Sequence, residues 1–434
     1  MNPTRRKLLA AALAAGLLAA GPASASAAAS TSGPRESYAA LGDVHVLKIG
    51  RPSAKRVVVL VSGMYGAANG FRVLARDLVA RTPDTQVWAV DRREQNLADL
   101  GGFQGGDPAR YYLDGRYRKS PTSSRARSWG LKVALDDLRG VVQAAADHGR
   151  RKVVLGGHSW GATTALAYAA WDFAGRPGYQ DLSGLLLIDG GVHGAFAGEG
   201  GTIHNAPEEV RARLAAIEKG EPFDSYLSQG KGFGARPEQA AIWYQLVAWY
   251  AHRDPHAPSV LADRLPEKLR PSRPVTNAGL LGWLVQAAPG TAPQLAVVSG
   301  RLGDDGDWVD DGMTPLSRVA EAMAGPAPGT FEWYWPQRLS LDLDAVDPYA
   351  DTESAELLGL RLWHARRVNV PLYAFESGLD KGTELTAARW VVKHSRIPRA
   401  TYAGDHAMKH LDPLFAAPGR NELTRTLVPF LRGL

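Results

Sequence analysis

The chain has 434 residues, of which 45% are hydrophobic and 22% charged, an ordinary balance for a globular protein with one large interrupted domain or two domains. It contains no cysteine, which excludes disulfides, thiolate metal sites and cysteine nucleophiles. The formal net charge of +6 falls to +3 once Arg5, Arg6 and Lys7 are set aside with the N-terminal segment. Lys and Arg form no cluster interleaved with aromatic residues, so nucleic acid is not expected as a partner.

Residues 1–29 have the pattern of a Tat-like signal peptide. A basic start with twin arginines, Thr4-Arg5-Arg6-Lys7, precedes an uncharged run over 8–20 and small residues suited to cleavage over 23–29. The uncharged run is too short to span a bilayer comfortably, and no later stretch has the length and hydrophobicity to do so. The sequence therefore predicts an exported protein, secreted or periplasmic, with no integral membrane segment after signal removal.

Residues 38–190 alternate between strand-like and helix-like patterns. Residues 44–49 alternate apolar and polar side chains, as a half-exposed strand does, whereas 57–61 are all Val or Leu, as in a strand buried on both faces. Strands are also expected at 86–91, 152–155 and 184–189, and helices at 70–80 and 129–148. Residues 101–127 are rich in Gly, Arg, Tyr and Ser, which predicts a long surface excursion.

The alternation stops near residue 191 and resumes near residue 366. A strand is expected at 370–375, a helix at 384–394, a short strand at 399–403 and a last helix at 412–431. Strands that alternate with helices indicate a parallel sheet with right-handed crossovers. We therefore predict one α/β domain made of 38–190 and 366–434, split by an insertion over 191–365.

The most informative motif is Gly157-His158-Ser159-Trp160-Gly161, which lies between a predicted buried strand and a predicted helix. A serine in so sharp a turn has its hydroxyl exposed at the top of the sheet, and glycines are needed where side chains would clash. The following helix directs its N-terminal amides and positive dipole end at the same place. This geometry favours an oxygen nucleophile and an oxyanion.

With these parts in this order, residues 44–190 and 366–434 resemble the α/β-hydrolases that carry a large cap. The resemblance implies a mostly parallel sheet with helices on both faces, a cap formed by the insertion, and Ser159 as nucleophile. It also implies that the catalytic acid and then the histidine follow the serine along the chain.

The oxyanion loop is expected at Val61-Ser62-Gly63-Met64-Tyr65-Gly66, directly after a buried strand. It resembles the family's His-Gly turn, with Ser62 in place of the histidine. The amides of Met64 and Trp160 are the expected oxyanion donors, since fixed amides need not reorganise as charge develops. The departure at Ser62 leaves Met64 and Tyr65 as alternatives for the first donor.

The acid and the base each have rivals. Asp380 lies where the family's acid usually falls, a few residues beyond the strand 370–375, with Glu376 as second choice and Asp189 as third. The base is expected in the loop before the last helix, where His410-Leu411-Asp412-Pro413 resembles a family pattern and favours His410 over His406. We expect Asp412 as N-cap and Pro413 at the first helical position to hold His410 next to a rigid element.

Residues 191–360 of the insertion contain six tryptophans, and the insertion also has two acidic stretches. The tryptophans are Trp243, Trp249, Trp283, Trp308, Trp333 and Trp335, and packing within the insertion is favoured over lining a substrate pocket. His158 and His193 are further candidates to line that pocket. The acidic stretches, 304–311 and 341–348, offer oxygen ligands for calcium, but neither matches an EF-hand loop. We expect no cofactor and no catalytic metal.

These observations predict a secreted serine hydrolase that cleaves carboxylic esters of small or lipid-like molecules through an acyl-serine intermediate. One alternative is a serine peptidase, because Gly156 to Gly161 resembles the Gly-Gly-x-Ser-Trp-Gly of capped prolyl aminopeptidases. Another is a non-catalytic binding protein on a hydrolase fold. The acyl group, the leaving group and the oligomeric state do not follow from the sequence.

Overall fold

A computed structural model describes residues 34–434 apart from 120–123, 201–202, 204–205, 289–291 and 326–330. The predicted signal segment, residues 1–29, lies outside the described residues. Within the part that the structure describes, no helix combines the length and hydrophobicity needed to cross a bilayer.

The centre of the fold is an eight-stranded sheet in the order β1-β2-β4-β3-β5-β8-β11-β12. Strand β2 runs antiparallel to both its neighbours, and every other neighbouring pair is parallel. The bounds are β1 Glu36–Leu41, β2 Val44–Ile49, β3 Arg56–Val61, β4 Thr85–Asp91, β5 Lys152–His158, β8 Gly184–Ile188, β11 Leu372–Glu376 and β12 Ala400–Gly404. The predicted mostly parallel α/β sheet is therefore confirmed.

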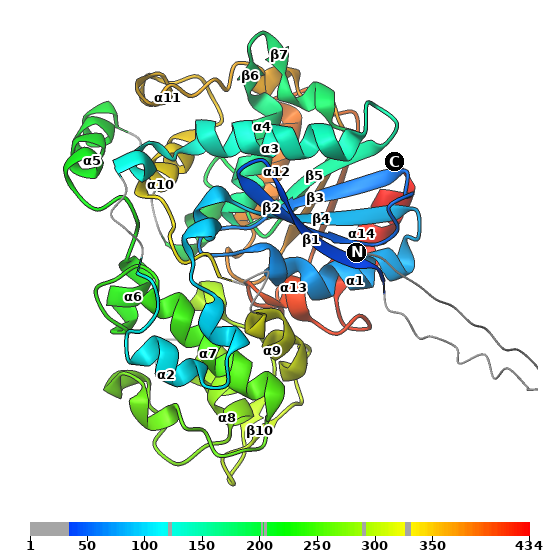
Figure 1. Ribbon diagram of the computed structural model, residues 1–434. Helices are drawn as coiled ribbons and strands as arrows, with labels where there is room; N and C mark the ends of the chain where they lie inside the picture. The colour runs from blue at the N-terminus through cyan, green and yellow to red at the C-terminus, as the bar shows by residue number, and fades with distance from the viewer. Residues whose placement is uncertain (1–33, 120–123, 201–202, 204–205, 289–291, 326–330) are drawn as a thin grey trace, which may run out of the picture. The chain divides into compact units, whose positions relative to one another are not determined.

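Helices cover both faces of this sheet (Figure 1). Alternate residues of β3 face opposite sides, so that Val58 and Leu60 join one buried core and Val57 and Val59 join the other. The first core includes α1 (Arg72–Arg81) and α14 (Glu422–Arg432). The second includes α3 (Leu131–Ala146), α4 (Trp160–Ala170) and α12 (Thr383–Lys393). Because helices cover both faces of the sheet, the accessible loops lie at the strand ends, and functional sites commonly form on such loops.

Between β8 and β11 the described residues add no strand to the main sheet. They form α5 Pro207–Lys219, α6 Tyr226–Lys231, α7 Gln239–Arg253, α8 Asn277–Gly282, α9 Leu316–Ala324, α10 Gln337–Val346 and α11 Glu353–Leu358, with the short hairpin β9 Arg301–Leu302 and β10 Trp308–Val309. Of the six tryptophans in 191–360, five are buried, and Trp283 is partly buried against the core that contains Trp243, Trp249, Trp308 and Trp333. The interpretation of these residues as packing of the insertion is therefore supported.

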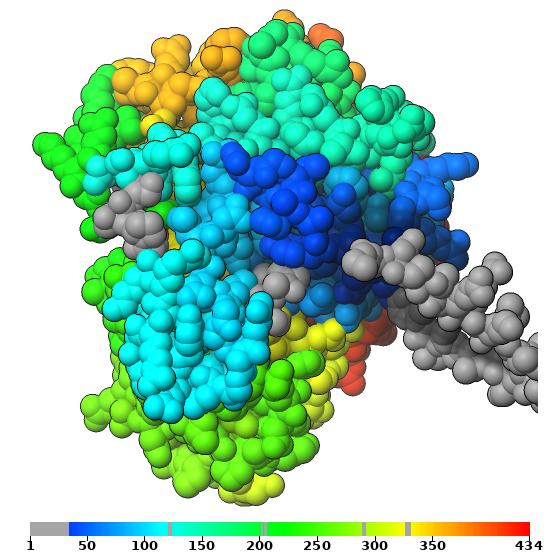
Figure 2. All heavy atoms as spheres, viewed as in Figure 1, coloured from blue at the N-terminus to red at the C-terminus, as the bar shows by residue number. Residues whose placement is uncertain are grey.

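Residues 101–127 differ from the predicted surface excursion. They contain α2 (Pro108–Leu113), which packs against α7, and the side chains of Phe103, Tyr112 and Tyr117 are buried. The hydroxyl of Tyr117 donates a 2.8 Å hydrogen bond to Glu238 Oε1. Figure 2 shows α2 in cyan against the green insertion. The sequence does not indicate this packing, because glycine and arginine dominate the segment and the few tyrosines that pack show no helical periodicity.

The C-terminal region also differs in detail. The single helix expected over 412–431 is two helices, α13 (Asp412–Phe415) and α14, separated by Pro418-Gly419. Proline and glycine both disfavour a helix interior, and the Asn421 side chain starts α14 by accepting a hydrogen bond from the amide of Thr424. Asp412 is not the N-cap that the sequence predicted, since α13 begins at Asp412 itself. Its carboxylate instead accepts hydrogen bonds from the amides of Val298 and Lys409.

Candidate active site

Ser159 lies at a strained turn between β5 and α4, with φ of 57° and ψ of −130°. A Cβ atom on Gly157 would lie 2.1 Å from the carbonyl carbon of Gly161, and one on Gly161 would lie 2.0 Å from the Val61 oxygen. Both glycines are therefore required by backbone contacts. The predicted sharp turn, with Ser159 at its corner and a helix directly after it, is present.

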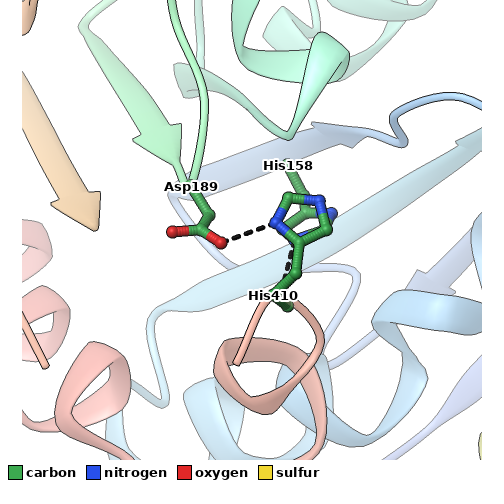
Figure 3. Close-up of side chains that lie close together, drawn as sticks. All are labelled: His158, Asp189 and His410. Carbon is green, nitrogen blue, oxygen red and sulfur yellow. Dashed lines mark hydrogen bonds and ion pairs between the residues drawn. The ribbon is translucent and has the colours of Figure 1, made fainter. Parts of the chain in front are cut away.

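His410 and Asp189 form a buried pair beside this turn (Figure 3). His410 Nδ1 lies 2.6 Å from Asp189 Oδ2, and both side chains are almost fully buried. Asp189 also accepts hydrogen bonds from the amide and the hydroxyl of Ser377. Because a carboxylate only accepts, Nδ1 carries the hydrogen and Nε2 keeps its lone pair.

The electrostatics favour an ionised Asp189. Burial alone would raise the pKa of Asp189, but the hydrogen bond and charge of His410 lower that pKa to about 2. The carboxylate therefore stays charged at neutral pH, where it can hold the imidazole tautomer and stabilise an imidazolium.

The prediction that Asp380 is the partner of the base disagrees with this geometry. Asp380 follows β11, is buried, and has no hydrogen-bond partner on either carboxylate oxygen. Asp189 directly follows β8, which pairs with β5, the strand that Ser159 directly follows. Its φ of 51° turns the chain back over the sheet edge at once. The carboxylate that pairs with His410 therefore comes from the strand next to β5, one strand nearer Ser159 than Asp380.

Burial raises the pKa of Asp380 to about 7, and the negative charges of Glu199 and Asp189 act in the same direction. Burial likewise raises the pKa of Glu384 well above its ordinary value, together with the charge of Asp189. Asp380 and Glu384 are thus two buried carboxyl groups behind the Asp189–His410 pair; no N–H or hydroxyl group of the described residues donates to either, and Glu384 contacts both Asp189 and Asp380.

The two rival residues of the sequence prediction contact each other instead. His406 Nε2 lies 2.6 Å from Glu376 Oε1, and the imidazole is 62% exposed. Glu376 Oε2 also accepts a hydrogen bond from the amide of Leu385. Neither His406 nor Glu376 lines the cavity that contains Ser159.

His158 contacts the candidate base from the other side. Its Nε2 lies 2.8 Å from the carbonyl oxygen of His410, and the two rings are 4.2 Å apart between centroids. Since a carbonyl only accepts, His158 Nε2 carries the hydrogen. Burial and the neighbouring His410 lower the pKa of His158 to about 3, so this ring remains neutral. His193, in contrast, stacks on Trp390 and does not line the cavity.

The candidate oxyanion loop lies directly against the serine. A Cβ atom on Gly63 would lie 3.1 Å from Ser159 Oγ, which shows how closely the loop approaches. Among the described residues, no hydrogen bond is made by the amide of Met64 or of Trp160, and Trp160 is the first residue of α4. Amides at a helix start and in such a loop are suitable donors to an oxyanion.

A cavity of about 760 Å³ connects these parts. Ser159, His410, Met64 and Trp160 line it, and so do residues of the insertion. Most of the remaining lining is apolar and includes Phe71, Phe196, Leu227, Leu295, Met323, Phe331, Leu414 and Phe415. A volume of this size suits a small organic ligand or a lipid chain.

Among the described residues, the side chains closest to a metal-ligand arrangement are His158, Asp189 and His410. A metal ion on these atoms would have to displace the Asp189–His410 hydrogen bond. Carboxylates of the acidic stretches already have protein partners. Asp307 binds His256 and Thr276, and Asp342 binds Arg338 and the amide of Leu131. The geometry offers no preformed calcium loop there.

The sheet order and the serine at the turn after β5 decide the architecture. The chain has the α/β-hydrolase fold.

Several solved structures resemble this chain. A protein from Sulfolobus solfataricus with a provisional lipase assignment is 17% identical, with 90% of this chain and 89% of that chain covered and a TM-score of 0.47. A lipase in an open form is 18% identical, with coverage of 92% and 98% and a TM-score of 0.44. An epoxide hydrolase from an endophytic Streptomyces is 16% identical, with coverage of 92% and 96% and a TM-score of 0.42. No protein-family model matches the sequence, and no curated protein matches it.

Proposed function

We propose that the protein is a serine hydrolase that cleaves carboxylic esters, with Ser159 as nucleophile, His410 as base and Asp189 as the orienting acid. The observation that carries the proposal is the buried 2.6 Å pair between Asp189 and His410, in a cavity that Ser159 also lines. A serine at a strained turn, an imidazole with a fixed tautomer and a buried carboxylate are the parts of acyl transfer.

In this mechanism Ser159 Oγ attacks the ester carbonyl while His410 Nε2 takes its proton. The tetrahedral oxyanion accepts hydrogen bonds from the amides of Met64 and Trp160. Collapse expels the alcohol, which receives the proton from His410. A water molecule then attacks the acyl-serine, with His410 again as base, and the acid product leaves.

The cavity favours an ester with an apolar acyl chain. Its apolar lining comes from both α13 of the core and α9 of the insertion, and it surrounds the serine. We propose that the insertion acts as a cap that excludes water from the reacting carbonyl. Glu199 is a carboxylate on this lining, and it accepts a hydrogen bond from Gln294. The serine-peptidase alternative would need such a carboxylate to bind a substrate amine.

The purified protein should therefore hydrolyse p-nitrophenyl esters faster than aminoacyl anilides. Ser159→Ala removes only the nucleophilic oxygen, and it should lower turnover on the order of a million-fold while the melting temperature is kept. Turnover that survives in Ser159→Ala, or a preference for aminoacyl anilides, would overturn the proposal of an ester-cleaving serine enzyme.

The acyl-chain proposal has its own test at Gly70. Gly70 lines the cavity, and a Cβ atom there would meet no other atom within 4 Å. Gly70→Leu should fill part of the cavity and reduce the palmitate-to-butyrate ratio of kcat/KM by roughly 10-fold or more, because each misplaced methylene costs about 1–3 kcal/mol. Gly140→Leu is the matched control, since Gly140 also has open space but lies on the exposed side of α3. An unchanged ratio in Gly70→Leu would place the acyl chain elsewhere.

A further inference from the structure

One arginine holds the candidate oxyanion loop from behind. Arg92, the first residue after β4, donates from Nη1 to the carbonyl oxygen of Ser62 at 2.9 Å. Its Nη2 donates to the carbonyl oxygens of Gly63 at 3.2 Å and Gly66 at 3.3 Å. A single planar guanidinium thus contacts three carbonyls of a six-residue loop, 61–66; because Nη2 also donates to Glu332, one of its two hydrogens is shared between acceptors. Lysine has no comparable fork of donors.

The contact to Gly63 bears directly on the candidate oxyanion donor. The carbonyl of Gly63 and the amide N–H of Met64 belong to the same peptide unit, which is planar with the two groups pointing in opposite directions. When Arg92 holds the Gly63 oxygen, it also sets the direction of the Met64 N–H. A positive charge on the carbonyl side polarises the peptide, so that the N–H becomes a stronger donor.

The arginine is itself held by the insertion. Glu332 accepts hydrogen bonds from Arg92 Nε at 3.1 Å and from Nη2, and Trp335 lies with its ring 4.7 Å from the guanidinium carbon. The side chains of Arg92 and Glu332 are only 9% and 2% exposed. The amide of Glu332 donates to the carbonyl of Tyr65, so the same segment also contacts the loop through its backbone.

The charges in this cluster support a permanently cationic arginine. Burial acts to lower the pKa of Arg92, but the neighbouring Glu332 and Glu94 carboxylates raise it overall. Arg92 Nε and Nη2 both donate to Glu332 Oε2, and such charge-assisted hydrogen bonds are stronger than neutral ones.

We propose that Arg92 is a positioning residue that orients and polarises the Gly63–Met64 peptide as an oxyanion donor, and that Glu332 of the insertion holds Arg92 in place. This inference rests on the proposed serine-hydrolase function. It assigns Glu332 a role in rate, next to Phe331, which lines the cavity.

Arg92→Lys tests the inference, because lysine keeps the positive charge but has its three donors on one nitrogen, without the planar fork that reaches both the loop carbonyls and Glu332. Arg93→Lys is the matched control, since Arg93 pairs with Asp137 and does not contact the loop. Arg92→Lys should lower kcat for a p-nitrophenyl ester about 100-fold or more, as the loss of one oxyanion donor does, with little change in KM. The Ki of phenylboronic acid, which forms a tetrahedral adduct on serine, should rise by a similar factor. Arg93→Lys should leave kcat and Ki near those of the wild type.

Glu332→Gln is a second variant that keeps the arginine and weakens its anchor, so it should lower kcat in the same direction by a smaller factor. Normal kcat and Ki in Arg92→Lys would overturn the inference, and so would a fall in kcat without a matching rise in Ki. The tests of Arg92→Lys and Glu332→Gln require that the wild type hydrolyses the ester and that Ser159→Ala abolishes this turnover. If that turnover is missing, the proposed function fails first and for a separate reason.

Discussion

Two carboxylate–histidine pairs lie near the carboxyl edge of the sheet, and they differ in almost everything except their distance. Asp189–His410 and Glu376–His406 are both 2.6 Å apart. The first pair is buried and its histidine lines the cavity with Ser159, whereas the imidazole of the second is mostly exposed and lies outside that lining. A short histidine–carboxylate contact is therefore not a sufficient sign of a catalytic base.

The difference arises from the strands that carry each carboxylate. Asp189 follows β8, the immediate neighbour of β5 and Ser159, and Glu376 ends β11, one strand farther away. His410 is further fixed by His158 and by Asp412, whose carboxylate accepts the amide of Lys409 at 2.7 Å. The pair nearest the nucleophile is the one that the rest of the loop holds in place.

The comparison predicts its largest effect for the two histidines. His410→Gln should lower ester turnover on the order of a million-fold, because the proton of Ser159 then has no acceptor. His406→Gln should change turnover by less than about threefold, since its ring lies outside the cavity. Initial rates on a short p-nitrophenyl ester measure both. A dead His406→Gln beside an active His410→Gln would reverse the assignment of the base.

A smaller effect concerns the pH dependence of the free energy of unfolding, in which Asp380, with its raised pKa, differs from Asp189. The pKa of Asp380 is raised from 3.8 to about 7 in the folded protein, first by burial and then by the charges of Glu199 and Asp189. The folded state therefore binds more protons than the unfolded state between these pH values, and this group reduces the free energy of unfolding as pH rises through that window.

Asp380→Asn removes this titration. The free energy of unfolding of the variant, relative to that of the wild type, should therefore increase from pH 4.5 to pH 8. The gain is a few kcal/mol at most, because one pKa unit corresponds to about 1.4 kcal/mol. Urea unfolding at the two pH values measures it. Parallel changes in the wild type and Asp380→Asn would show that Asp380 does not titrate in this window.

Much of the architecture could be predicted from the sequence. The buried strands are continuous apolar runs, and the glycines on either side of Ser159 indicate a tight turn between a strand and a helix. The strand β1 is less evident because its residues are mostly half-exposed or exposed. The helix α2 and its contacts with the insertion depend on partners more than 100 residues away, such as Glu238 for Tyr117. Such contacts leave no local signal.

The expected pairing of Asp380 with His410 disagrees with the structure for a specific physical reason. A side chain directly after a strand ordinarily points along the sheet, whereas one several residues later can turn back over its edge. Asp189 turns back immediately because it adopts a positive φ, followed by Gly190-Gly191. A Cβ atom on Gly190 would lie 2.3 Å from the Ser159 carbonyl oxygen. An aspartate followed by two glycines at the end of a strand is therefore a sequence signal for a carboxylate that turns back over the sheet edge.

The most direct test of the account compares Asp189→Asn with Asp380→Asn in ester turnover, with Glu376→Gln as a further control. Asparagine at residue 189 keeps the shape but no longer fixes the His410 tautomer, so kcat should fall about ten-thousand-fold with the fold intact. Asp380→Asn and Glu376→Gln should stay within about tenfold of the wild type, because neither side chain forms a hydrogen bond with His410. A loss of that size in Asp380→Asn together with a near-normal Asp189→Asn would contradict the central claim that Asp189 and His410 serve Ser159.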